Sequence, residues 1–126
     1  MSAASPLVSV IVPNYNHARF LRQRLDSVLN QTWSALEVIL LDDASTDDSR
    51  SVIESYRADP RVTIHYNARN SGCVFKQWNK GLALAQGEYV WIAESDDYAD
   101  PRFLETLVTR LRDRPAASLA FCQSYN

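Results

Sequence analysis

Hydrophobic residues along the chain alternate between short unbroken runs and longer stretches in which apolar positions recur every three or four residues. Most of the short runs are rich in Val, Ile and Leu and do not alternate with polar residues. Such runs are typical of strands that are covered on both faces of a sheet. We therefore predict five strands, at residues 7–12, 37–41, 62–66, 89–93 and 117–122.

Four helices are predicted between these strands, because the intervening stretches place their apolar residues on one face at helical spacing. The four apolar faces consist of Phe20, Leu21, Leu25, Val28 and Leu29; of Val52, Ile53 and Tyr56; of Val74, Phe75, Trp78, Leu82 and Ala85; and of Phe103, Leu104, Leu107, Val108 and Leu111. Strict alternation of strand and helix with short connections predicts a three-layer α/β fold, with a mostly parallel sheet and helices on both faces.

Local signals mark where these helices begin and end. Asn16, Ser45 and Asp100 are expected at helix N-caps, since their side-chain oxygens can accept bonds from free backbone amides. Pro101 fits the first turn of the last helix. Gly87 is expected to terminate the third helix in the C-cap role.

Polar residues gather directly after four of the predicted strands, at residues 14–16, 42–43, 69–72 and 94–97. The carboxyl ends of parallel strands meet at one edge of the sheet. Ligands of such folds bind beyond that edge, where the strand order reverses. We therefore expect the four clusters to form one site.

Length, charge and cysteine usage narrow the class of protein. The chain has 126 residues and a net charge of −2, so we expect one domain and no nucleic-acid partner. Cys73 and Cys122 lack metal-binding spacing and are expected to be reduced thiols. No segment has the length of a transmembrane helix or the pattern of a signal peptide, and the expected location is cytoplasmic.

Glu94, Asp96 and Asp97 place three carboxylates within four residues after a buried strand. Hard divalent cations such as Mn²⁺ and Mg²⁺ take oxygen ligands, usually one or two carboxylates together with phosphates and water. The sequence thus indicates a metal site. The alternative is a solvated acidic turn whose Asp100 caps the next helix.

The other clusters suggest contacts to a nucleotide. A carboxylate at the position of Asp42 or Asp43 can accept a bond from a base or a ribose, although an Asx turn leading to Ser45 explains the pair equally well. Tyr15 could stack on a base or could simply be packed.

Arg69, Gly72 and Lys76 lie around the start of a helix, an arrangement that suits a diphosphate. The chain contains neither GxGxxG nor GxxxxGK[ST], which weighs against dinucleotide-binding and P-loop proteins. His17 and His65 have no evident partner and are expected to be structural.

The combined motifs resemble the inverting glycosyltransferases of family two, which have a GT-A fold. The matching segments are VSVIVPNYN at residues 8–16, SVLNQT at 27–32, EVILLDDASTDDS at 37–49, RNSG at 69–72, GEYV at 87–90 and ESDD at 94–97. Their order and spacing make the resemblance specific over nearly the whole chain.

The resemblance implies a nucleotide-diphosphate sugar donor, favouring UDP, and a divalent metal, Mn²⁺ or Mg²⁺. The nucleotide-binding set that we predict comprises Pro13, Tyr15, Asp42, Asp43, Arg69, Gly72, Lys76, Ser95 and Asp96. The metal-binding set comprises Glu94, Asp96 and Asp97. The metal would neutralise charge that develops on the departing diphosphate.

The sequence departs from the family pattern at two places. Glu94 stands where the family most often has Asp. The helix after Gly72 begins CVFKQWN, which is one residue longer than usual and lacks the common Ala-Arg-Asn run.

Family members are longer, and their later part supplies the acceptor site and a general base. Residues 1–126 are thus expected to be the donor-binding domain of an enzyme that glycosylates a glycan or a lipid-linked acceptor. In the full-length protein this domain would lie in the cytoplasm, peripheral to the inner face of the membrane.

Three other functions were weighed against glycosyl transfer. A non-catalytic module that binds nucleotide sugars has the same donor site. A phosphorelay receiver requires an acid pair near its first strand and a late Lys, whereas no Lys follows Lys80. A nucleotidyltransferase usually has a Gly- and Arg-rich loop after the first strand, where this chain has the residues at 13–16.

Overall fold

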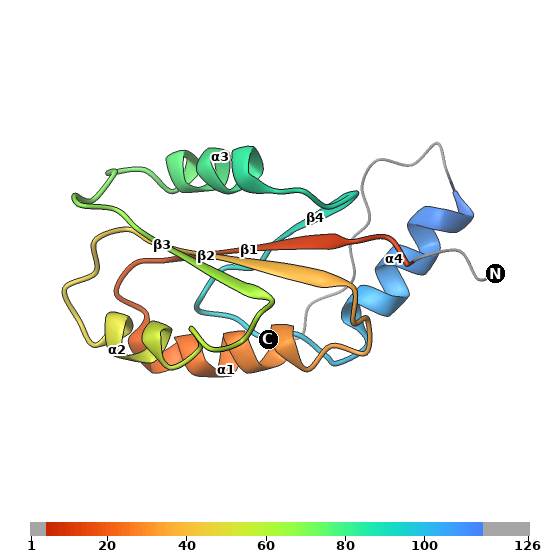
Figure 1. The fold of residues 1–126 in the computed structure, drawn as a ribbon, viewed down its shortest axis with the longest axis horizontal. Helices are drawn as coiled ribbons and strands as arrows, with labels where there is room; N and C mark the ends of the chain where they lie inside the picture. Colours follow the sequence, from red (N-terminus) through yellow and green to blue (C-terminus); the bar gives the residue numbers. More distant parts are fainter. Residues whose placement is uncertain (1–4, 115–126) are drawn as a thin grey trace.

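The computed structural model describes residues 5–114, in which four strands alternate with four helices (Figure 1). The elements are β1 (Val8–Asn14), α1 (Ala18–Leu29), β2 (Leu36–Asp42), α2 (Ser49–Glu54), β3 (Val62–Tyr66), α3 (Val74–Leu84), β4 (Tyr89–Ile92) and α4 (Phe103–Asp113). The strand predicted at 117–122, with Cys122, lies outside the described residues. None of the helices in residues 5–114 is long and apolar enough to cross a bilayer.

The four strands form one parallel sheet in the order β3-β2-β1-β4. Strand β1 is central: Val8 lies opposite Leu36 of β2 on one side and Tyr89 of β4 on the other. The chain proceeds from β1 through β2 to β3 in one direction and then crosses to the opposite side of β1. The predicted parallel sheet is confirmed, and its strand order reverses between β1 and β4.

Helices cover both faces of the sheet, as predicted (Figure 1). One face of the strands packs against α1, α2 and α4 in the larger core, where the side chains of Val10, Leu40 and Leu25 are fully buried. The opposite face carries Ile11, Ile39 and Leu41, and α3 lies over it. Alternate residues of each strand therefore supply the two cores, as the pleat requires.

The apolar face predicted for α3 is wrong, because most of it faces solvent. Val74, Phe75 and Leu82 are 43%, 59% and 47% exposed, whereas the buried residues of this helix are Gln77 and Gly81. A Cβ atom on Gly81 would lie 2.5 Å from Ile11 Cγ2, so the helix approaches the sheet through its smallest residue. This close approach sets which face of α3 is covered.

The predicted caps at Asn16 and Ser45 are also wrong, since the residues preceding α1 and α2 are His17 and Asp48 and neither makes a side-chain cap bond. Asn16 has a φ of 56° and its Oδ1 accepts a bond from the amide of Thr46 at 2.8 Å. The two connections thus bond to each other.

Asp100 does act at the start of the last helix, where its Oδ1 accepts a bond from the Arg102 amide at 2.9 Å. The helix itself begins one residue later, at Phe103.

Gly87 does not terminate α3, which ends at Leu84 with Ala85 in the C-cap position. Its amide donates to Ser9 Oγ at 2.7 Å. A Cβ atom on Gly87 would lie 2.7 Å from both the Leu7 carbonyl oxygen and the Ser9 amide nitrogen. The glycine is therefore required by close approach to the backbone of the central strand.

We predict that Gly87→Ala lowers the free energy of unfolding by about 1–3 kcal/mol, the usual cost of overpacking. The clash is with backbone atoms beside β1, which pairs with two neighbours and cannot move away. Urea denaturation would measure the change, with the neighbouring exposed Glu88→Ala as control. Equal stability of Gly87→Ala and wild type would contradict this packing.

Candidate functional site

A cavity of about 420 Å³ opens where the strand order reverses, beyond the carboxyl ends of β1 and β4. This is the position at which open parallel sheets bind ligands. The cavity is lined by Pro13, Asn14, Tyr15, His17, Asp43, Asn70, Gly72, Cys73, Val74, Gln77 and Glu94. Each of the four polar clusters identified in the sequence contributes to this wall, and the N-terminus of α3 completes it.

Asp42 lies behind the wall and does not line the cavity. Its carboxylate accepts bonds from Asn14 Nδ2 at 2.9 Å, from Ser45 Oγ at 2.7 Å and from the Ser45 amide at 3.0 Å. Asp42 is only 3% exposed. It ties the end of β1 to the end of β2 and so positions the neighbouring cavity residues.

Asp43 is the carboxylate of the pair that faces the cavity. Its Oδ1 accepts bonds from the Ser71 amide and Asn67 Nδ2, and its Oδ2 accepts one from Ser71 Oγ, all between 2.7 and 2.8 Å. Burial works to raise the pKa of Asp43, but these bonds and the nearby Lys80 lower it below the ordinary value. Asp43 is thereby held as an anion against the 67–72 loop.

Gly72 gives that loop its shape. Its φ is 75°, in the left-handed region that only glycine enters without strain. The amide of Gly72 donates to Asn70 Oδ1 at 2.7 Å, and Asn70 Nδ2 donates to the Asp43 carbonyl at 3.0 Å. The loop is thus folded back onto the end of β2, and both Asn70 and Gly72 reach the cavity.

Gln77 projects from the buried face of α3 toward the same cavity. Lys80 Nζ donates to Asn67 Oδ1, so the Asn67 amide nitrogen must be the atom that donates to Gln77 Oε1, at 2.8 Å. Gln77 Nε2 is therefore the free end of the side chain, and it is buried without a hydrogen-bond partner in the described structure.

Asn14 has a corresponding free acceptor. Its Nδ2 faces the carboxylate of Asp42, which leaves Oδ1 buried without a partner among the described residues. Buried polar atoms of this kind are rare in folded proteins and call for a particular explanation. A polar ligand in the cavity, or a water beneath it, would satisfy both Asn14 Oδ1 and Gln77 Nε2.

The acidic segment after β4 is held by residues from three other elements. Trp78 Nε1 of α3 donates to Glu94 Oε1 at 2.8 Å, and Arg24 Nε of α1 donates to the Glu94 carbonyl at 2.6 Å. His17 Nδ1 and Ser95 Oγ share a hydrogen bond of 2.8 Å. The segment is therefore fixed in place although its carboxylates face solvent.

Arg24 is the buried cation of this segment. Burial lowers its pKa, and the charges of Asp97, Asp96 and Glu94 act in the opposite direction. Its Nη2 lies 3.9 Å from Asp97 Oδ2, while Nη1 is buried with no partner in the described part of the chain. The guanidinium also lies over the Trp91 ring, 5.4 Å from its centroid.

The carboxylates that could hold a metal are Asp96 and Asp97, both exposed at the cavity end of β4. Within residues 5–114 no three His, Cys, Asp or Glu side chains converge as a ready-made metal cluster. Two adjacent carboxylates fit a cation that takes its remaining ligands from phosphate and water. Glu94 is directed instead toward Trp78.

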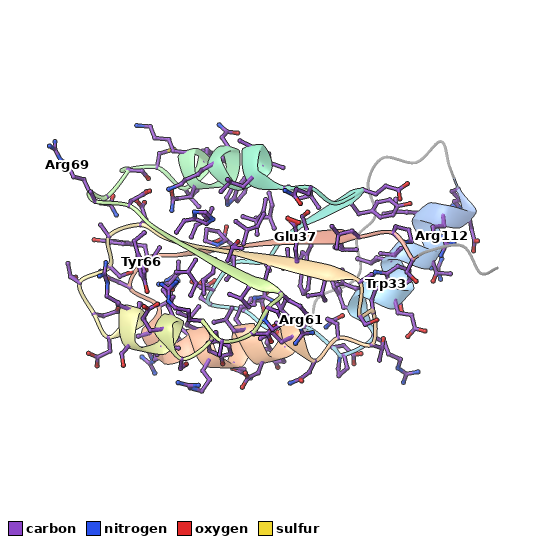
Figure 2. All side chains as sticks on the ribbon, in the orientation of Figure 1. Trp33, Glu37, Arg61, Tyr66, Arg69 and Arg112 are labelled. Carbon is purple, nitrogen blue, oxygen red and sulfur yellow. The ribbon has the colours of Figure 1, made fainter. Side chains whose placement is uncertain are left out.

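Two of the predicted nucleotide contacts lie apart from the cavity. Arg69 is exposed and extends away from the body of the protein at the tip of its loop (Figure 2). Lys76 is exposed and its Nζ donates to the Ser71 carbonyl at 3.4 Å. Ser95 is buried behind the wall through its bond to His17.

Sequence reasoning missed several residues of the site. His17 was expected to be structural, yet it lines the cavity and contacts the acidic segment; its position directly after the first polar cluster was the available signal. Gln77 could have been noticed as a polar residue on the buried face of a helix only after that face was known. Cys73 is a free, half-buried thiol in the wall.

Comparison with known proteins was made for both sequence and structure. The family model described as glycosyl transferase family 2 matches residues 9–126. The chain is 35% identical over 113 residues to glycosyltransferase GlyG of Streptococcus pneumoniae, and the match covers 89% of this chain and 37% of GlyG. It is 37% identical over 118 residues to the putative teichuronic acid biosynthesis glycosyltransferase TuaG of Bacillus subtilis, covering 93% of this chain and 46% of TuaG.

Solved structures show the same fold. S. aureus TarS in complex with UDP-GlcNAc has a TM-score of 0.80 and 32% identity, over 86% of this chain and 32% of that chain. The mannosyltransferase PcManGT from Pyrobaculum calidifontis, in complex with GDP-Man and Mn²⁺, has a TM-score of 0.78 and 31% identity, over 88% of this chain and 34% of that chain.

The chain thus spans less than half the length of these relatives. The family model nevertheless covers nearly all of it, and the resemblance inferred from the motifs is confirmed, as is the GT-A-like parallel fold. The chain therefore belongs to glycosyl transferase family 2.

Proposed function

We propose that the chain binds a nucleotide-diphosphate sugar in the cavity between β1 and β4, as the donor-binding part of an inverting, metal-assisted glycosyltransferase. The observation that carries the proposal is the position of this cavity at the reversal of strand order, with a fixed acidic segment at its rim. A diphosphate lying between Gly72 and the acidic segment would place its charge beside the α3 N-terminus.

The base would occupy the part of the cavity formed by Pro13, Tyr15 and Asp43. Tyr15 is half exposed at the rim and offers an aromatic ring for stacking. Asp43 uses three of its lone pairs internally and keeps one free for a base N–H. TarS is described in complex with UDP, which favours uridine, and PcManGT with GDP-Man, which leaves guanosine as the alternative.

Asp96 and Asp97 are the residues that we assign to the metal. A bound Mn²⁺ or Mg²⁺ would supply a Lewis acid for the departing diphosphate. Of the two, we assign Asp96 as the direct ligand, because Asp97 Oδ2 lies 3.9 Å from the Arg24 guanidinium. Arg24 would keep the segment from carrying the uncompensated charge of three carboxylates.

Inverting transfer requires a base that takes the proton of the acceptor hydroxyl. Asp43 is surrounded by internal donors, and the acidic segment is committed to the donor side. We therefore place the base outside residues 5–114, together with the site for a glycan or lipid-linked acceptor. Formation of a glycosylated acceptor by the complete protein would distinguish the enzyme from a module that only binds nucleotide sugars.

Donor binding is predicted to depend on metal and on Asp96. Calorimetric titration with UDP, TDP and GDP should give one preferred nucleotide in Mn²⁺, and affinity should fall about tenfold or more in EDTA or in Asp96→Asn. Asp113→Asn, an exposed carboxylate on α4, is the matched control and should bind as wild type does. Nucleotide affinity that is the same in Mn²⁺ and EDTA would refute the metal-assisted site.

The Asp43 network predicts a defined pH dependence of stability. The folded-state pKa of Asp43 is depressed, so its contribution is present above the unfolded value of 3.8 and is lost as the pH falls through the folded value. Ser71→Ala removes one bond to the carboxylate and should cost about 1 kcal/mol at pH 7.

Denaturation of Ser71→Ala and wild type at several pH values would measure this effect. The difference should shrink as the pH falls below the ordinary Asp pKa, and the pKa of Asp43 in the variant should rise. Exposed Ser34→Ala is the control and should cost little at any pH. A Ser71→Ala effect that is independent of pH would show that the lost bond does not act through the Asp43 charge.

A further inference from the structure

Glu94 is joined across the cavity to α3 by a single directed bond. Trp78 Nε1 donates to Glu94 Oε1 at 2.8 Å, and the indole nitrogen can only donate. Glu94 is half-buried and belongs to the cavity wall, together with Tyr15 and His17. The bond therefore fixes the direction in which this carboxylate points.

Both partners of this bond are held by further contacts. The Phe75 ring meets the Trp78 ring edge-on, with centroids 5.1 Å apart and an angle of 84° between the planes. On the other side of the sheet, Arg24 Nε donates to the Glu94 carbonyl at 2.6 Å. The backbone of Glu94 is thus fixed from α1 and its side chain from α3, so the carboxylate is preorganised at the cavity.

This arrangement separates Glu94 from the other carboxylates of its segment. Asp96 and Asp97 are exposed, and Glu94 does not converge with them into a group of three within residues 5–114. Trp78 occupies Oε1, and no hydrogen bond from the described residues reaches Oε2. A carboxylate oxygen with free lone pairs in a cavity wall is an acceptor suited to a hydroxyl group.

We propose that Trp78 is a positioning residue that withdraws Glu94 from the metal-binding set and presents its second carboxylate oxygen to a hydroxyl of the bound nucleotide sugar. The inference rests on the proposed donor site and revises the metal role that the sequence suggested for Glu94. The hydroxyl can belong to the ribose or to the glycosyl group, because both are polyols that donate hydrogen bonds to a carboxylate.

The decisive experiment compares the affinity for UDP and for UDP-GlcNAc of wild type, Trp78→Phe and Glu94→Gln, each with Mn²⁺ and with EDTA. Trp78→Phe keeps an aromatic ring but removes the N–H donor, and Glu94→Gln keeps the side-chain shape but removes the charge. Both should weaken binding about 3- to 10-fold, as expected for a bond to a charged group. The loss should be equal with and without metal.

Two comparison variants make the result specific. Trp33→Phe removes a similar indole bond, 3.1 Å to the Pro6 carbonyl, near α4 and away from the cavity (Figure 2), and should bind as wild type does. Asp96→Asn should instead abolish the difference between Mn²⁺ and EDTA. A merely structural defect would lower the melting temperature of Trp78→Phe and Trp33→Phe alike, without sparing the metal effect.

The two ligands identify the hydroxyl. A loss already present with UDP assigns it to the ribose, and a loss seen only with UDP-GlcNAc assigns it to the glycosyl group; either supports the inference. Unchanged affinity for both ligands in folded Trp78→Phe and Glu94→Gln overturns it, as does a loss of the metal effect equal to that of Asp96→Asn. If wild type binds neither ligand, the proposed donor site itself fails.

Discussion

The site depends on the parallel pairing of β1 with two neighbours, β2 and β4, that lie on opposite sides of it. This pairing buries every residue of β1 and brings the carboxyl ends of three strands to one edge. Because the chain leaves β1 toward β2 but returns on the side of β4, the connections diverge and leave a cavity between them. The glycine at 87 preserves the close approach that begins the β1–β4 pairing.

Buried hydrogen bonds then decide which polar residues are available to a ligand. Asp42 is consumed by Asn14 and Ser45, whereas Asp43 is held as an anion in the cavity wall. At the other rim, Arg24 lies beneath the acidic segment with its charge opposite the carboxylates. A buried cation of this kind needs such partners, since an unpaired charge in the interior is costly.

The sequence was sufficient for the architecture but only in part for the site. Unbroken apolar runs located all four described strands, and residues 62–66 coincide with β3. The covered face of α3 could not be predicted, because it is set by the close approach of Gly81 to Ile11 and by the polar contact of Gln77, both of which are tertiary. The contacts of Trp78 and Arg24 with Glu94 join residues 16 and 70 positions apart, beyond the reach of local patterns.

The account's central claim is that the nucleotide binds in the cavity between β1 and β4. Titration of the isotope-labelled chain with UDP and Mn²⁺, followed by amide NMR spectra, tests this most directly. The account predicts that the largest shifts occur at Tyr15, Asp43 and Gly72 and at the side-chain amides of Asn14 and Gln77. Shifts concentrated instead on α4, at the opposite end of the sheet from this cavity, would contradict it.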